Sequence, residues 1–217
     1  GATRDFMVIR LNANGDYDPT FGTGGLVYTD ISGRFDDPNA VVIQSDGKIV
    51  VGGTSSVGGW GDMAFVRYMP NGSLDTTFDG DGILLLNSFL GLVGDSITTL
   101  SIQPDGKIVG GGRVDTDFLL ARVNLDGTLD QSFGNNGIVV TNSSGFADNL
   151  ADLAILPDGK ILAAGGSGRC VVARYNPNGL LDSGYGAGGL FIMDTGFFTR
   201  CNAIIVQIDG KSVVSGY

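Results

Sequence analysis

One hairpin signature occurs four times in this 217-residue chain and limits its fold more than any other feature. Each copy places two apolar runs of strand length around an Asp-Gly-Lys turn, and Asp-Gly tolerates the positive φ angles of a tight hairpin. The four turns begin at Asp46, Asp105, Asp158 and Asp209. Four copies in a chain of this length indicate a repeat protein.

Each repeat has two further constant parts. An apolar strand that ends in arginine leads into a loop with glycine, aspartate and an aromatic residue at fixed offsets, and a short strand follows. The arginines are 57, 55 and 52 residues apart, and each period holds four strands. Four-stranded units at periods of about 40 to 50 residues are typical of β-propeller blades.

The repeat therefore predicts an all-β fold, a single β-propeller domain over residues 1–217 with four blades of four antiparallel strands. The blades are expected at residues 39–87, 97–141 and 150–193, and at 202–216 together with 5–30. In this last blade the terminal strands pair in one sheet and close the ring, which removes exposed sheet edges. A fragment of a longer array and a ring made of two chains are the alternatives.

The repeat resembles the delta-60 repeat family of bacterial proteins. The resemblance rests on the pattern Phe-x-x-x-Arg-x-Asn-x-x-Gly-x-x-Asp-x-x-Phe-Gly followed by Gln-Pro-Asp-Gly-Lys-Ile-Val, and residues 124–134 with 157–161 lie close to it. The fourth copy departs from it at Tyr185, Ile208 and Ser212. The resemblance implies a β-propeller in secreted or surface proteins, and it implies little about activity.

Composition narrows the function classes. The net charge of −10 argues against binding to nucleic acid, and no apolar stretch suggests membrane insertion. The chain contains no histidine and its 23 acidic residues are all aspartate, which excludes Ser-His-Asp and Cys-His catalysis within it. We therefore expect no enzymatic activity and no catalytic residue.

The repeated arginines and aspartates are expected to be structural. Each arginine lies eight residues before an aspartate, so a strand and a short loop can bring the two together within one blade. The expected ion pairs are Arg10–Asp18, Arg67–Asp75, Arg122–Asp130 and Arg174–Asp182. A ring of ligand-binding arginines is the alternative.

Function is expected on the loops that vary between copies, because variable loops on a fixed scaffold carry most binding sites. These loops join the repeats, or join the second strand to the third, and we call the side they occupy the loop face. The candidate ligand-binding residues there are Trp60, Phe35, Asp36, Asp95, Asp148 and Arg200. Trp60 lies in the long insertion 54–61 and suits stacking on a ligand, with packing on its own blade as the alternative.

Asp36, Asp95 and Asp148 occupy the same position in three repeats, just before the first strand. They are candidate metal ligands around the mouth of the central channel, where a calcium ion is the expected cofactor, if any. The alternative is that each caps its own strand by local hydrogen bonds. Cys170 and Cys201 are expected to be free thiols about two strand widths apart, beyond the roughly 7 Å reach of a disulfide.

These features favour a non-enzymatic extracellular or cell-surface recognition module that binds a glycan or a protein on the loop face. One alternative is a lyase or hydrolase that uses the aspartates at the channel mouth. The other is a structural spacer in a larger multidomain surface protein.

Overall fold

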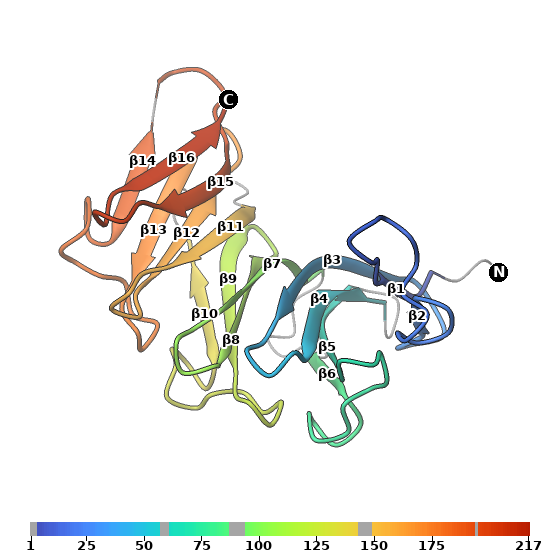
Figure 1. The fold of residues 1–217 in the computed structure, drawn as a ribbon. Helices are drawn as coiled ribbons and strands as arrows, with labels where there is room; N and C mark the ends of the chain where they lie inside the picture. Colours follow the sequence, from blue (N-terminus) through green and yellow to red (C-terminus); the bar gives the residue numbers. More distant parts are fainter. Residues whose placement is uncertain (1–3, 57–60, 87–93, 143–148, 194) are drawn as a thin grey trace. The chain divides into compact units, whose positions relative to one another are not determined.

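The computed structural model describes residues 4–56, 61–86, 94–142, 149–193 and 195–217. The regular elements of this part of the chain are β-strands, which form three four-stranded and two two-stranded antiparallel sheets (Figure 1). No helix in the described residues is long and apolar enough to cross a membrane.

The four-stranded sheets each use four consecutive strands of the chain. The first contains β3 (Asp36–Ile43), β4 (Ile49–Ser55), β5 (Asp62–Tyr68) and β6 (Ile83–Leu86). The second contains β7 (Ser96–Ile102), β8 (Ile108–Val114), β9 (Asp117–Val123) and β10 (Ile138–Thr141). The third contains β11 (Leu150–Ile155), β12 (Ile161–Gly165), β13 (Cys170–Tyr175) and β14 (Leu190–Met193). Because these are the meanders expected of propeller blades, the predicted fold class is confirmed.

The terminal strands form the two-stranded sheets, β1 (Phe6–Ile9) with β2 (Leu26–Thr29) and β15 (Cys201–Val206) with β16 (Ser212–Gly216). The expected pairing of residues 202–216 with 5–30 in one shared sheet concerns strands of two different compact units and stays a prediction. Each pair of strands is joined by its own loop, so its mutual hydrogen bonds form without the other half. β15 packs against β11 of the third sheet, and β1 lies beside β3 of the first.

Three local features stabilise the Asp-Gly-Lys turns, namely a side-chain hydrogen bond, a positive φ angle at glycine and a backbone hydrogen bond. In the first turn the Asp46 carboxylate accepts the Lys48 amide at 3.1 Å, and Gly47 adopts a φ of +84°. The Gln44 amide donates to the Lys48 carbonyl at 2.8 Å, which closes the turn between β3 and β4. The register that follows pairs Ile43 with Ile49 and continues along both strands.

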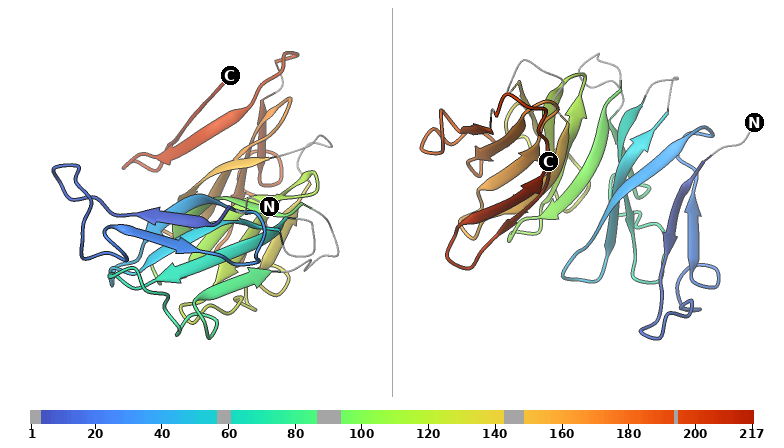
Figure 2. Two further views of the ribbon diagram at one scale, coloured as in Figure 1. Left: turned by 90° about the vertical axis from the view of Figure 1, so that its right-hand side faces the viewer. Right: turned by 90° about the horizontal axis from the view of Figure 1, so that it is seen from above.

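The chain forms two compact units, residues 1–96 with 126–128 and residues 97–125 with 129–217. In the first unit Phe6, Phe21, Val51, Val66 and Tyr68 build a core between the sheets β1–β2 and β3–β6. In the second unit one core joins the second and third sheets, and another joins β12 and β13 to β15. Figure 2 shows the hairpin β15–β16 beside the third sheet in both views.

The expectation of two free thiols is wrong, because Cys170 and Cys201 form a disulfide with 4.8 Å between their Cα atoms. The expectation counted strand widths within one sheet, but the two cysteines lie on strands of different sheets that pack face to face. The segment before Cys201 fixes this arrangement, since Thr199 bridges to Gly168 and its hydroxyl accepts the Cys170 amide at 3.0 Å.

Candidate functional site

Each repeated arginine forms an ion pair with the aspartate expected for it. In every repeat the arginine Nε donates to the aspartate Oδ2, at 2.8 Å for Arg10–Asp18, 2.7 Å for Arg67–Asp75, 2.8 Å for Arg122–Asp130 and 2.8 Å for Arg174–Asp182. The guanidinium of each also lies over the aromatic residue of the loop, 4.4 to 4.8 Å from the ring centre. This repeated geometry describes the inside of a blade rather than a ligand site.

The lysine of the hairpin turn completes this cluster in three repeats, a role that sequence reasoning missed. Its Nζ lies 3.0 Å from Oδ2 of Asp75, 2.6 Å from that of Asp130 and 3.0 Å from that of Asp182, for Lys48, Lys107 and Lys160 respectively. The identical Asp-Gly-Lys spacing in all repeats was the available signal. Lys211 of the fourth turn instead lies 2.7 Å from its neighbour Asp209.

The aspartates at the centre of these clusters remain ionised. Burial raises the pKa of Asp130, but hydrogen bonds from Lys107 and Ser132 and the charge of Arg122 outweigh it and hold the pKa well below 3.8. Asp75 shows the same balance, with Thr77 and Lys48 as the hydrogen-bond donors and Arg67 as the neighbouring charge. Each carboxylate is therefore neutralised within its own sheet.

The candidate residues of the loop face are dispersed. Asp36 and Asp95 are both buried at 1% exposure, whereas Trp60 and Asp148 lie outside the described residues. Among the described residues, Asp36 lies in a cluster of three carboxylates, and Asp95 is not part of that cluster. A common metal site for Asp36 and Asp95 is therefore not formed.

Phe35 and Arg200 lie in different parts of the molecule. Phe35 is 49% exposed and its ring lies 5.4 Å from the guanidinium carbon of Arg4. The backbone of Arg200 pairs in both directions with that of Tyr217, and its side chain lines a hollow of about 320 Å³ beside β14 and β16.

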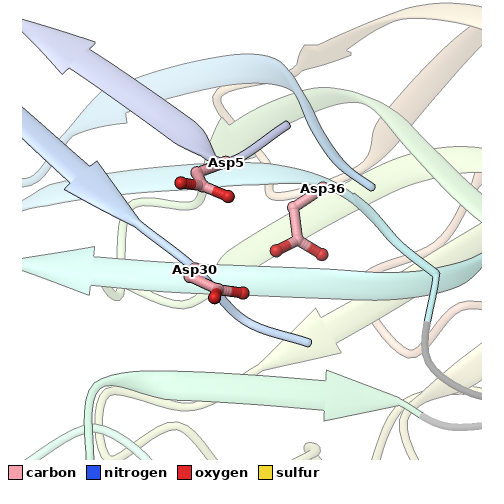
Figure 3. A group of neighbouring side chains, drawn as sticks. All are labelled: Asp5, Asp30 and Asp36. Atoms are coloured by element: carbon pink, nitrogen blue, oxygen red, sulfur yellow. The ribbon is translucent and has the colours of Figure 1, made fainter. Parts of the chain in front are cut away.

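Asp36 instead joins two aspartates that sequence reasoning did not select. Asp5 precedes β1, Asp30 follows β2 and Asp36 opens β3, and one carboxylate oxygen of each lies within 4.8 Å of the others. Figure 3 shows the three carboxylates turned toward a common space from three chain segments. All three belong to the first compact unit.

The loop between β2 and β3 holds this cluster in place. Asp36 accepts the Ile31 amide at 2.8 Å and the hydroxyls of Ser32 at 3.0 Å and Ser55 at 2.6 Å. Asp30 caps the same loop by accepting the amides of Ser32 and Gly33. Asp36 thus makes the local hydrogen bonds of the capping alternative, and these also orient its carboxylate toward Asp5 and Asp30.

Asp5 lacks such support. Its Oδ1 is buried and has no hydrogen-bond partner among the described residues, and none of the three carboxylates pairs with a lysine or arginine there. A buried carboxylate oxygen without a donor is costly, so this atom calls for a positively charged or hydrogen-bonding partner.

The sequence did contain a signal for Asp5. The residue at the start of the third strand of the repeat, or directly before it, is aspartate three times, as Asp5, Asp62 and Asp117, and arginine once, as Arg169. Oδ1 of Asp117 is likewise buried without a partner among the described residues. The same position thus leaves a bare carboxylate oxygen in two separate repeats.

Three converging carboxylates with no nitrogen or sulfur ligand suit a hard cation. Calcium takes six to eight oxygen ligands from carboxylates, carbonyls and water, and tolerates irregular geometry. Asp30 is exposed, so the cluster opens to solvent on its side and can receive further oxygen ligands from water or from a bound molecule. The arrangement provides charge and metal ligands rather than a nucleophile with a base.

The chain matches one described protein family, and that match agrees with the fold. No curated protein matches the chain. Among solved structures, the PQQ-bound form of aldose sugar dehydrogenase from Streptomyces coelicolor is similar at 12% identity and a TM-score of 0.45, over 100% of this chain and 75% of that one. The family described as "Domain of unknown function (DUF5122) beta-propeller" matches residues 1–21, 44–78, 103–133 and 156–185, more than half of the chain. The chain therefore belongs to this β-propeller family.

Proposed function

We propose that this chain is a non-enzymatic recognition module that binds a glycan or a protein on the loop face that carries Trp60, with a calcium ion held by Asp5, Asp30 and Asp36. The observation that carries the proposal is the convergence of the three carboxylates around the unpartnered Oδ1 of Asp5. Glycan hydroxyls and protein carboxylates are both ligands that calcium accepts.

Charge explains why a cation belongs there. Three carboxylates within 4.8 Å repel one another, and Asp36 is at the same time almost completely buried. A divalent cation relieves this repulsion and provides a partner for Oδ1 of Asp5. The exposed side of Asp30 then leaves coordination positions for the ligand.

An apolar contact lies close to these charges. Phe35 precedes Asp36 directly and exposes half of its side chain. Aromatic rings beside polar groups suit sugar faces and protein anchors alike, because they offer a large apolar area at low entropic cost. Trp60, from the insertion 54–61, is the second aromatic residue proposed for this surface.

An extracellular or cell-surface location is part of the proposal. The Cys170–Cys201 disulfide supports it, because disulfides persist in oxidising compartments and are rare in the cytosol. The resemblance to delta-60 repeat proteins supports it independently.

The metal step is tested with calcium alone. Isothermal titration with CaCl₂ is expected to show one site that Asp30→Asn weakens by at least about tenfold, since even the loss of outer-shell partners costs about 10–100-fold. The control is Asp115→Asn, which makes the same change of charge at an exposed turn residue with a φ of +50° that asparagine tolerates. A protein that binds no calcium, or equal weakening by both variants, contradicts the metal site.

The recognition step is tested with a glycan array and a panel of surface proteins, each probed in CaCl₂ and in EDTA. We expect binding that EDTA removes and that Phe35→Ala or Trp60→Ala weakens. Binding that survives both EDTA and the two substitutions places the ligand elsewhere. An empty array and panel favour the structural spacer.

A further inference from the structure

The turn that follows the third strand is built in the same way in all four repeats. Its first side chain, which is Asn14, Asn71, Asp126 or Asn178, accepts the amide of the residue two positions later at 3.0–3.2 Å. A glycine with a φ of +86° to +90° lies between the two residues. The four copies therefore share one backbone and differ in the chemistry of their side chains.

The copy at residues 71–73 combines an amide with a hydroxyl. Oδ1 of Asn71 accepts the Ser73 amide at 3.1 Å and the Ser73 hydroxyl at 2.9 Å. Nδ2 of Asn71 has no hydrogen-bond partner in the described part of the chain, and both side chains are exposed. Asn71-Gly72-Ser73 is thus an exposed Asn-x-Ser sequence, the acceptor pattern of N-linked glycosylation.

The other three copies each lack one part of this pattern. In the turn at 14–16 the third residue is Asp16, and Nδ2 of Asn14 donates to its carboxylate at 2.8 Å. In the turn at 126–128 the Thr128 hydroxyl donates at 2.7 Å, but the acceptor is the carboxylate of Asp126. In the turn at 178–180 a leucine takes the place of the hydroxyl residue. Asn71 alone among these four positions offers an amide nitrogen beside a bound hydroxyl.

The backbone of this turn is held firmly against the N-terminal sheet of the same compact unit. The Asn71 carbonyl accepts the Gly22 amide at 2.8 Å. Gly72 is buried, and a Cβ at this position would lie 2.9 Å from the Gly22 nitrogen. The middle residue of the acceptor sequence is therefore fixed as glycine, while the side chains on either side of it face outward.

A groove beside the turn has room for a sugar. It has a volume of about 730 Å³, lies between β2 and the turn, and includes Asn71, Ser73, Thr23 and Tyr28 in its lining. The residues that line it are uncharged, and the side chain of Tyr28 is 64% exposed. Hydroxyls and an exposed aromatic ring suit the polar edges and the apolar faces of a sugar.

We propose that Asn71 carries an N-linked glycan, a modification that rests on the extracellular location in the proposed function. The donor is a glycosyl pyrophosphate and the catalyst is a glycosyltransferase. Nδ2 of Asn71 bonds to the anomeric carbon of the sugar and loses one proton to a base of the transferase. The bond between that carbon and the pyrophosphate oxygen breaks, and the oxygen keeps the electron pair. The Ser73 hydroxyl holds Oδ1, so that Nδ2 is the end of the amide left for the sugar.

The position of the glycan is compatible with recognition on the loop face. The strand β5 begins at Asp62, directly after the insertion 54–61, and ends at Tyr68, three residues before Asn71. Seven residues of strand span about 20 Å. A glycan on Asn71 therefore covers the turn end of this sheet and leaves the loop end accessible.

The experiment is mass spectrometry of the protein collected from the medium of its own cells. The tryptic peptide 68–107 contains one Asn-x-Ser/Thr sequence, at Asn71, and is expected to be heavier than its sequence mass by at least one sugar. Ser73→Ala should restore the sequence mass, because it removes the hydroxyl and keeps the backbone bond of the turn. Ser73→Thr is the matched control and should retain the added mass.

A second variant tests the turn by gain of modification. Asp126→Asn supplies the amide where the Thr128 hydroxyl is already in place. The tryptic peptide 123–160, which also contains Asn142-Ser143-Ser144, should then carry a further sugar that fragmentation assigns to position 126. No sugar at this position counts against the turn as the acceptor.

Two results overturn the proposal. One is a peptide 68–107 at its sequence mass in the extracellular protein, and the other is an added mass that survives Ser73→Ala. Cell fractionation tests the location separately. An extracellular protein with unmodified Asn71 contradicts the glycan and leaves the recognition module standing, whereas a cytosolic protein contradicts both.

Discussion

The second four-stranded sheet and the N-terminal pair of strands contain the same ion pair in different surroundings. Arg122–Asp130 and Arg10–Asp18 each have a 2.8 Å contact between the same atoms. The first pair is 7% exposed on both sides, whereas the second is 33% exposed at the arginine and 19% at the aspartate. Local sequence therefore sets the geometry of the pair, and the neighbouring strands set its environment.

The difference comes from the first half of the blade. In the second sheet Lys107 and Gln103 both approach the pair from the hairpin β7–β8, with the Gln103 Oε1 accepting from Arg122 at 3.2 Å. In the N-terminal sheet, which contains β1 and β2 alone, the hydroxyl that donates to Asp18 is that of Thr20. The comparison teaches that a blade shares its charges across both halves and needs both to bury them.

The largest expected effect comes from breaking the buried pair. Asp130→Asn should lower the free energy of unfolding by about 3–5 kcal/mol, because it leaves the buried Arg122 charge without its carboxylate. Asp18→Asn is the matched control and should shift the urea midpoint far less, since water can reach Arg10. Equal shifts for the two variants would show that burial does not distinguish the two regions.

A second comparison concerns the C-terminal sheet β15–β16. A disulfide links it to β13 across 31 residues of sequence. Cys170→Ala/Cys201→Ala should cost about 3–4 kcal/mol by the loop-entropy estimate. Limited proteolysis should then remove β15–β16 before it cuts the four-stranded sheets. A protease pattern unchanged by the substitutions would mean that packing alone holds this sheet.

A smaller effect is expected at a buried hydroxyl. Tyr175 follows the arginine of the third sheet, is fully buried and donates to the Thr141 hydroxyl at 2.9 Å. Tyr175→Phe should cost about 0.5–1.5 kcal/mol in thermal or urea unfolding. The equivalent residue in the N-terminal sheet is Leu11, 55% exposed, and Leu11→Ala should stay within about 0.5 kcal/mol. A larger loss at Leu11 would indicate a covering strand.

The smallest expected effect is on the pH dependence of the free energy of unfolding, through the carboxylate of Asp130. The folded pKa of Asp130 lies below its unfolded value of 3.8, so its contribution is present above that pH and is lost as the pH falls below it. At pH 3 the loss should be about 1 kcal/mol. Unfolding curves from pH 7 to pH 3 should therefore fall less steeply for Asp130→Asn than for the unmodified protein, and parallel curves would contradict the assigned pKa direction.

The parts of this molecule that sequence predicts are those made within one repeat. The hairpins, the strand order within each sheet and the Arg–Asp pairs depend on residues close in sequence, and repetition exposes them. The disulfide depends on two sheets packing face to face, which strand widths within one sheet do not report. The Asp5, Asp30 and Asp36 cluster draws on three chain segments. Asp36 was found because its position repeats, and Asp5 was missed although its position repeats as well.

The repeated cluster of arginine, lysine and aspartates determines which residues account for the net charge of the chain. Three repeats contribute one arginine, one lysine and two aspartates each, namely the aspartate of the ion pair and that of the turn, and the fourth contributes the pairs Arg10–Asp18 and Lys211–Asp209. Eight of the 13 basic residues and eight of the 23 aspartates are thus used in three neutral quartets and two neutral pairs, and the other five arginines and fifteen aspartates account for the entire charge of −10. A gene can therefore duplicate the framework of this repeat without adding self-repulsion, while its variable segments alone set the electric field that an approaching molecule meets.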